Sequence, residues 1–84
     1  MIKAKIVVTL KKGVSDPQGL TVHNALKTMQ YSTISDVRVG KYIEVLLNSK
    51  SAEEAKTEIQ SICEKLLVNP IIEQYQYELE RVKT

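Results

Sequence analysis

The chain has a single histidine and a single cysteine, His23 and Cys63, and these are the first side chains to weigh for chemistry. A histidine serves as a general base only beside a nucleophile in a cleft, and His23 lies in a predicted helix with no such motif around it. Cys63 lies on an apolar stripe between Ile62 and Leu66, where a thiol behaves as a small buried hydrophobe. We predict an exposed helix histidine, a structural cysteine, no metal site and no catalytic residue.

The turn at residues 12–19 contains two glycines, which makes it a candidate for a phosphate-binding loop. Such a loop brings backbone N–H groups close to the phosphates, usually at the start of a helix. Here Asp16 stands at the helix start and would repel a phosphate. An acylphosphatase-like enzyme would also need an arginine in this loop, and residues 12–15 have none. We predict an ordinary turn that binds no nucleotide.

Tyr75 and Tyr77 share one face of a predicted strand and resemble, in isolation, a platform for stacking bases. That face also carries Ile71 and Leu79, which favours packing against the helices. The charge agrees, because 12 Lys plus Arg against 10 Asp plus Glu give a net of +2 with the signs mixed along the chain. The sequence therefore predicts no nucleic-acid partner.

An arginine, a glycine and an aromatic residue with a polar tip fall within five positions, in the segment from Arg38 to Tyr42. Arg and Tyr are enriched at the energetic centres of protein interfaces. One interpretation is an anchor for a partner protein, with Arg38 pointing outward. The other is an ordinary solvated turn around Gly40 and Lys41. The residues alone leave both open.

Period-two and helical patterns alternate along the chain. Apolar residues at every second position predict a half-buried strand over residues 2–10. A capping side chain at Ser15 or Asp16 before Pro17 predicts a helix that ends near Gln30, with an apolar stripe formed by Val22, Ala25, Leu26 and Met29. We then predict two strands, 34–39 and 42–47, joined as a hairpin around Gly40 and Lys41.

A second helix is predicted from the capping box of Ser51 and Glu54, and Asn69-Pro70 ends it. Residues 71–82 return to period two and predict a long last strand. The order βαββαβ favours an α+β, ferredoxin-like fold, in which a four-stranded antiparallel sheet carries both helices on one face. The first strand then lies beside the last, so that Lys3 and Lys5 face Glu78 and Glu80.

Eighty-four residues are enough for one domain, which we expect to span residues 1–84. So small a core predicts marginal stability for a monomer, and hence an obligate dimer. There is no run of about eighteen apolar residues to cross a membrane and no signal-peptide pattern, which predicts a cytoplasmic protein.

Three segments resemble a known family over essentially the whole chain: 16–19 (DPQG), 35–44 (SDVRVGKYIE) and 63–73 (CEKLLVNPIIE). The chain is similar to PurS, the small subunit of phosphoribosylformylglycinamidine synthase, in the de novo pathway of purine biosynthesis. The resemblance implies a non-catalytic subunit that forms a homodimer or a dimer of dimers. It would bridge a large synthetase subunit and a glutaminase subunit, and assist assembly and ammonia transfer.

In that family the complex, and not this chain, uses ATP and magnesium, so the resemblance implies no cofactor bound here. It also brings no catalytic residue. Its motif positions correspond to interface roles, and the predicted interface residues are Asp16, Gln18, Arg38, Gly40, Lys41, Tyr42, Asn69 and Pro70. The alternative is a small regulatory module of ferredoxin-like fold, which would bind an amino acid or a nucleotide between subunits and be stabilised by it.

Overall fold

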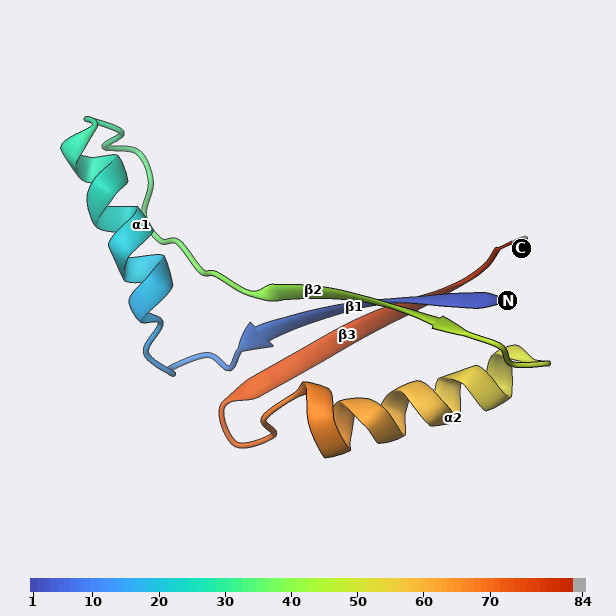
Figure 1. Cartoon of the computed structure of the whole chain (residues 1–84). Helices are drawn as coiled ribbons and strands as arrows, with labels where there is room; N and C mark the ends of the chain where they lie inside the picture. The colour runs from blue at the N-terminus through green and yellow to red at the C-terminus, as the bar shows by residue number, and fades with distance from the viewer. Residues whose placement is uncertain (83–84) are drawn as a thin grey trace.

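A computed structural model describes residues 1–82 and shows a narrow antiparallel sheet with one helix along it and a second helix held away from it (Figure 1). The strands are β1 (Ile2–Leu10), β2 (Lys41–Leu47) and β3 (Glu73–Arg81). They lie in the order β2-β1-β3, so the first strand is central and the last is its neighbour, as predicted.

The two faces of the sheet follow from the alternation in β1. Ile2, Ala4, Ile6 and Val8 are each at most 2% exposed and form the centre of the core. The intervening lysines lie on the open face, where the register pairs Lys3 with Glu80 and Lys5 with Glu78. The predicted charge pairing between the first and last strands is therefore confirmed.

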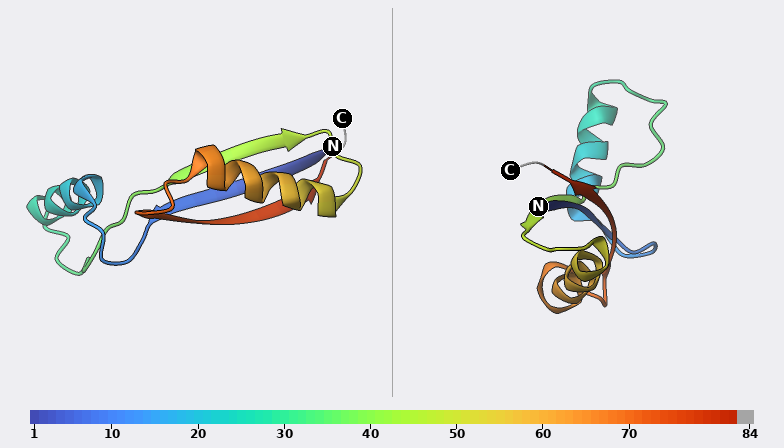
Figure 2. Two further views of the ribbon diagram at one scale, coloured as in Figure 1. Left: turned by 90° about the horizontal axis from the view of Figure 1, so that it is seen from below. Right: turned by 90° about the vertical axis from the view of Figure 1, so that its right-hand side faces the viewer.

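Helix α2 (Ala52–Ile62) covers the apolar face, as Figure 2 shows from two further directions. Ser51 caps it, since its hydroxyl accepts a hydrogen bond from the Glu54 N–H at 3.2 Å. The helix continues as one wider turn, η1 (Cys63–Leu67), before the chain enters β3. The core is completed by Leu47, Ala55, Ile59, Cys63 and Val68.

Helix α1 (Pro17–Thr28) also begins as predicted, with Asp16 as its cap and Pro17 in its first turn. It lies beyond the end of the sheet and covers neither face of it (Figure 1). The Cα radius of gyration is 16.5 Å, against about 12 Å for a compact chain of this length. We call residues 11–40, which carry α1, the arm, and the strands with α2 and η1 the body.

The four-stranded prediction is corrected at this point. Within residues 1–82 the sheet has three strands, because segment 34–39 forms no strand and no hairpin with β2. The reason lies at Gly40, where the chain runs straight into β2, and Lys41 is already paired with Val8 of β1. The prediction that both helices cover one face was wrong for α1. Because the chain does not turn back at Gly40, α1 lies away from the sheet.

Candidate partner-binding surfaces

The junction between arm and body is held by the side chain of Asp16. One carboxylate oxygen accepts a hydrogen bond from the Gly19 N–H at 2.9 Å, and the other accepts one from the Val39 N–H at 2.8 Å. The side chain is only 6% exposed. These bonds, first that from Gly19 and then that from Val39, lower the pKa of Asp16 below its ordinary value. Asp16 thus links the two chain segments that join the arm to the body.

Arg38 completes this junction from the other side. Its Nη2 donates to the Lys11 carbonyl at 3.4 Å, and its Nε lies 3.8 Å from Asp16 Oδ2. The side chain remains 40% exposed. We call Lys11, Asp16, Arg38, Val39 and Gly40 the neck. Arg38 therefore contacts its own chain as well as solvent, which the outward-pointing prediction did not include.

At Gly19 and Gly40 the backbone approaches another backbone segment too closely to leave room for a Cβ atom. A Cβ on Gly40 would lie 2.5 Å from the Val8 carbonyl oxygen, and a Cβ on Gly19 would overlap the Val37 carbonyl oxygen. Gly40 has no positive φ, so the turn conformation considered for it does not occur. Both glycines let backbone pass against backbone, which keeps the neck narrow.

Gln18 and Lys41, two further predicted residues, meet Asp16 and Gly40 around a small cavity of about 290 Å³ beside the neck. Lys41 Nζ lies 3.4 Å from the Glu73 carboxylate, across the entrance to the last strand. The Glu73 pKa is lowered, first by a hydrogen bond from the Asn69 N–H and then by Lys41. Four of the predicted interface residues, Asp16, Gln18, Gly40 and Lys41, thus lie together at one end of the sheet.

Asn69 and Pro70 lie at the corner between η1 and β3. The Asn69 side chain accepts from the Ile71 N–H at 3.1 Å, and the Pro70 carbonyl accepts from Lys11 Nζ at 2.6 Å. This corner also exposes Leu66 and Ile71, each 81% exposed. We call these four residues the corner. Its hydrophobic side chains form an exposed surface beside the neck.

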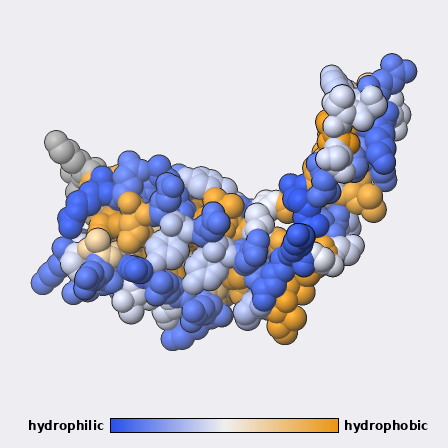
Figure 3. Space-filling model, turned by 180° about the vertical axis from the view of Figure 1, so that it is seen from behind, coloured by the Kyte–Doolittle hydropathy of each residue, from blue (hydrophilic) through white to orange (hydrophobic). Residues whose placement is uncertain are grey.

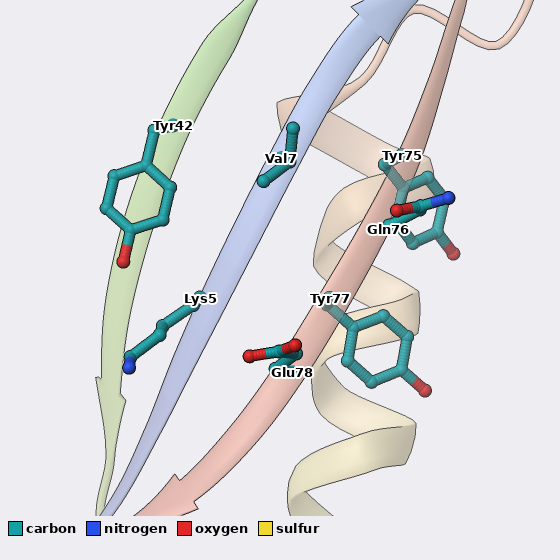
Figure 4. Close-up of a pocket in the computed structure, with 7 residues that line it drawn as sticks. All are labelled: Lys5, Val7, Tyr42, Tyr75, Gln76, Tyr77 and Glu78. Carbon is teal, nitrogen blue, oxygen red and sulfur yellow. The ribbon is translucent and has the colours of Figure 1, made fainter.

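Tyr42 belongs to a different surface, the open face of the sheet opposite α2. There Lys5, Val7, Tyr42, Gln76 and Glu78 line a shallow groove (Figure 4). Val7 is 45% exposed and Tyr42 is 58% exposed on this side of the sheet. The groove is apolar at its centre and charged at its edges.

Ion pairs surround that groove. Lys5 Nζ lies 2.7 Å from Glu80, Lys3 Nζ lies 3.5 Å from Glu44, and the Tyr42 hydroxyl donates to Glu44 at 2.8 Å. The hydrogen bond to Glu80 is the main reason the Lys5 pKa is raised, and the bond to Glu44 the main reason the Tyr42 pKa is raised. These exposed pairs fix side-chain orientation more than they stabilise the fold.

The side chains considered as candidates for chemistry have structural roles in the fold. Cys63 is fully buried, and burial raises its thiol pKa, so the prediction of a structural cysteine is confirmed. His23 is half-buried, not exposed as predicted, and its Nε2 lies 2.9 Å from the Ile34 carbonyl oxygen. Tyr75 and Tyr77 pack against the core as predicted, with ring centroids 6.3 Å apart.

Within residues 1–82 the structure has no cluster of metal-ligating side chains, and none of the helices there is both long and apolar enough to cross a membrane. The surfaces that sequence reasoning missed are the corner hydrophobics Leu66 and Ile71. The sequence contains a sign of this exposure, because Ile71 directly follows Asn69-Pro70. That pair interrupts both the helix and the following strand.

Comparison with known proteins gives a family match and full-length relatives. The family described as "PurS: Phosphoribosylformylglycinamidine (FGAM) synthase" matches residues 3–81. The chain is 46% identical over 82 residues to the phosphoribosylformylglycinamidine synthase subunit PurS of Bacillus subtilis, covering 98% of this chain and 96% of the relative. Both matches run through the body and the arm.

Solved structures agree in shape. The PurS of Methanocaldococcus jannaschii, one of the subunits of formylglycinamide ribonucleotide amidotransferase in the purine biosynthetic pathway, is 34% identical to this chain. Its structure has a TM-score of 0.88, and the match covers 99% of this chain and all of that one. A chain in the structure of PurLQS from Thermotoga maritima is 27% identical with a TM-score of 0.83, covering 95% and 99%. Because the arm is over a third of the residues, likeness of this quality includes the extended arm.

Proposed function

The chain belongs to the PurS family of phosphoribosylformylglycinamidine synthase, and from this premise we propose that it works as the non-catalytic subunit that holds the other subunits of that enzyme together. It is a subunit of a glutamine-dependent ligase of purine biosynthesis. The observation that carries the proposal is the full-length likeness, arm included, to a chain of the Thermotoga maritima PurLQS structure. We assign it the bridge between the large synthetase subunit and the glutaminase subunit, with a part in ammonia transfer.

The shape of the chain supports a bridging role. A protein that binds two larger partners needs separate exposed surfaces, and three occur here: the groove on the open face, the corner, and the exposed side of the arm. Figure 3 shows hydrophobic surface on both the body and the arm. Exposed apolar patches bordered by polar groups are typical of protein interfaces. Gln18, Lys41 and Tyr42 are exposed in this chain and are the predicted residues we place in contact with partners.

Further parts of the proposal concern what surrounds the chain. We propose one domain over residues 1–84, a homodimer or dimer of dimers, and a cytoplasmic location. ATP and magnesium are used by the complex and are not held by this chain. The alternative, a regulatory module that binds a small ligand, is not favoured, because the family match over residues 3–81 makes the chain a subunit of phosphoribosylformylglycinamidine synthase.

The proposal is tested by reconstitution from purified subunits. The large synthetase subunit and the glutaminase subunit are assayed for formylglycinamidine ribonucleotide with this chain present or absent. Glutamine and ammonium chloride serve in turn as the nitrogen source. We expect this chain to be required with glutamine, and to matter little with ammonium, because ammonium bypasses the handover between subunits.

The control is the purified chain alone, which should neither hydrolyse glutamine nor consume ATP. Glutamine-dependent turnover by the two large subunits without this chain would contradict the bridging role. Thermal stabilisation of the isolated chain by an amino acid or a nucleotide would instead favour the regulatory alternative.

A further inference from the structure

The arm is joined to the body by two short chain segments and by little else. Lys11 ends the first segment at the body, where its N–H donates to the Ile72 carbonyl at 2.8 Å. Lys41 ends the second, in register with Val8 of β1. Within residues 1–82, helix α1 has no extensive contact with the strands, α2 or η1, and it lies beyond the end of the sheet (Figure 1). The direction of the arm is therefore set at the neck.

One carboxylate closes the neck. The two oxygens of Asp16 accept separate hydrogen bonds, from Gly19 in the helix at 2.9 Å and from Val39 in the returning segment at 2.8 Å. The same side chain therefore caps α1 and links the entering segment to the returning one. Arg38 adds a longer contact, with its Nη2 3.4 Å from the Lys11 carbonyl. The bond from Val39 is the shorter of the two links, and little water reaches it, because the Asp16 side chain is only 6% exposed.

The entering segment is poorly built to hold the arm by itself. Residues 11–16 form no helix and no strand. Gly13 lies in the middle of this segment with a φ of +90°, and no heavy atom lies within 4 Å of its Cβ position. A glycine without packing contacts allows the backbone to bend. Loss of the bond from Val39 would therefore leave the arm on two flexible connections.

The arm itself is held together along its length. His23 Nε2 lies 2.9 Å from the Ile34 carbonyl oxygen, and the Tyr31 N–H donates to the Leu26 carbonyl at 3.0 Å. Helix α1 has 12 residues and is about 18 Å long, so a swing of about 20° at the neck would move its far end by about 6 Å. In most preformed interfaces the backbone moves by no more than about 1 Å on binding. A loose neck would thus misplace α1 for any preformed partner surface.

We infer that Asp16 is a positioning residue, whose bond from Val39 fixes the direction in which the arm presents α1 to the larger subunits. This inference rests on the proposed bridging role and adds the residue that sets its geometry. A chain whose arm swings freely has the competent direction for only a fraction of the time. Its apparent affinity for the larger subunits is reduced by that fraction. The carboxylate then acts on assembly through the arm.

The first test measures the direction of the arm in the full-length chain without other subunits. Spin labels are attached at Lys27→Cys in the arm and Lys56→Cys in α2, where both parent residues are exposed, and pulsed electron paramagnetic resonance gives the distance distribution. Cys63 is fully buried and takes no label. An excess of unlabelled chain is added, so that two labels on one chain dominate the signal even when chains associate. The parent protein should give one narrow distribution.

Asp16→Ser is the variant that separates the two bonds of this side chain. A serine hydroxyl caps a helix about as well as a carboxylate does, so the bond from Gly19 is kept. The bond from Val39 is lost, because serine is shorter and has a single oxygen. We expect the distance distribution to widen by roughly twofold or more, with the helix content in circular dichroism unchanged. If the serine variant loses helix, Asp16→Asn takes its place and should widen the distribution in the same way, since its amide N–H faces the Val39 N–H.

Asp36→Ser is the matched control. Asp36 lies in the same part of the arm and also accepts a backbone hydrogen bond, from the Val37 N–H at 2.9 Å, but this bond joins neighbours in sequence and does not cross the neck. The substitution removes the same charge and should leave the distance distribution unchanged. Equal widening by the two serine variants, or the parent width for Asp16→Ser, would overturn the inference.

The second test asks whether the direction of the arm matters for assembly. The large synthetase subunit and the glutaminase subunit are titrated with each variant, and glutamine-dependent turnover gives the concentration for half-maximal activity. Asp16→Ser should raise this concentration by roughly tenfold, as expected when the competent direction is populated about a tenth of the time. Asp36→Ser should leave it unchanged. A widened distribution with an unchanged half-maximal concentration would contradict the positioning role.

A direct contact between Asp16 and a partner predicts a different pair of results. It would raise the half-maximal concentration while the distance distribution keeps its parent width, and this outcome too would overturn the inference. The spectroscopic test needs no other subunit, so its result stands if the bridging role fails. Glutamine-dependent turnover by the two larger subunits in the absence of this chain would count against the bridging role alone.

Discussion

The body and the arm each contain a helix with an apolar stripe, and the two helices end in opposite states. In the body, α2 buries Ala55 and Ile59 completely against the sheet. In the arm, the apolar stripe of α1 is weaker, and Gly19 is the only buried residue of that helix. The difference shows that an amphipathic pattern indicates which side of a helix or strand is to be covered. It does not indicate whether the same chain or another molecule covers that side.

The largest expected effect tests that comparison in the body. Ile59→Ala removes a fully buried side chain and should lower the free energy of unfolding by about 2–5 kcal/mol. Leu20→Ala is the counterpart in the arm, and it should change stability by less than about 0.5 kcal/mol. Urea unfolding followed by circular dichroism measures both. Similar losses for the two variants would mean that the arm is packed far more tightly than its exposure indicates.

A smaller effect is expected at the neck. Gly40→Val adds a branched side chain 2.5 Å from the Val8 carbonyl oxygen, so backbone must shift. We expect a loss of about 1–3 kcal/mol, as for other overpacked sites. Gly13→Ala is a useful comparison, because Gly13 has open space around its Cβ position and is strained only by its φ of +90°. Stability equal to the parent protein would remove the close-approach explanation for Gly40.

The third prediction concerns acid. The Asp16 pKa is lowered in the folded chain, so its stabilisation is complete above its ordinary pKa and is lost as the pH falls through the lowered value. Asp16→Asn should flatten the fall in melting temperature below about pH 4, near the ordinary pKa of an aspartate. At neutral pH it should melt a few degrees lower than the parent. An unchanged acid profile would show that other carboxylates control the transition.

The smallest effect is expected at Arg38. Its 3.8 Å approach to Asp16 is long and half-exposed, so Arg38→Ala should cost less than about 1 kcal/mol of stability. If Arg38 also contacts a partner, the same variant should weaken assembly with the two larger subunits by roughly 1–2 kcal/mol or more. Thermal melts and titration into the partners separate these effects. A large stability loss with normal assembly would make Arg38 a neck residue alone.

Much of the body could be predicted from the sequence, because the forces that set it are local or strongly patterned. Alternation in β1 fixed its buried face, and the charges on both strands matched Lys3 with Glu80 in the observed register. The cap at Ser51 placed the start of α2, and in the arm the cap at Asp16 likewise placed the start of α1. Each of these signals acts over a few residues or repeats along a whole strand.

The arm could not be predicted in the same way. The hairpin prediction relied on Gly40 as a turn residue, whereas Gly40 serves a close backbone contact with Val8, which lies far away in sequence. The interface role predicted for Asp16 stays a prediction, and the sequence carries no sign of the hydrogen bond that Asp16 accepts from Val39 of its own chain. Both contacts join distant segments, and neither leaves a periodic trace in the sequence.

The pairing of β1 with β3 has a consequence for how the protein is made. The register joins Ile2 with Arg81, so of the three strands the central one is synthesised first and its longer partner, β3, is synthesised last. One edge of β1 therefore has no partner strand, and the core side chains of β1 stay incompletely covered, until β3 has been synthesised. Such distant pairing is slow to form compared with local contacts. During that interval the nascent strand, with Ile2, Ala4, Ile6 and Val8 uncovered, depends on early pairing with β2 or on a chaperone to avoid aggregation.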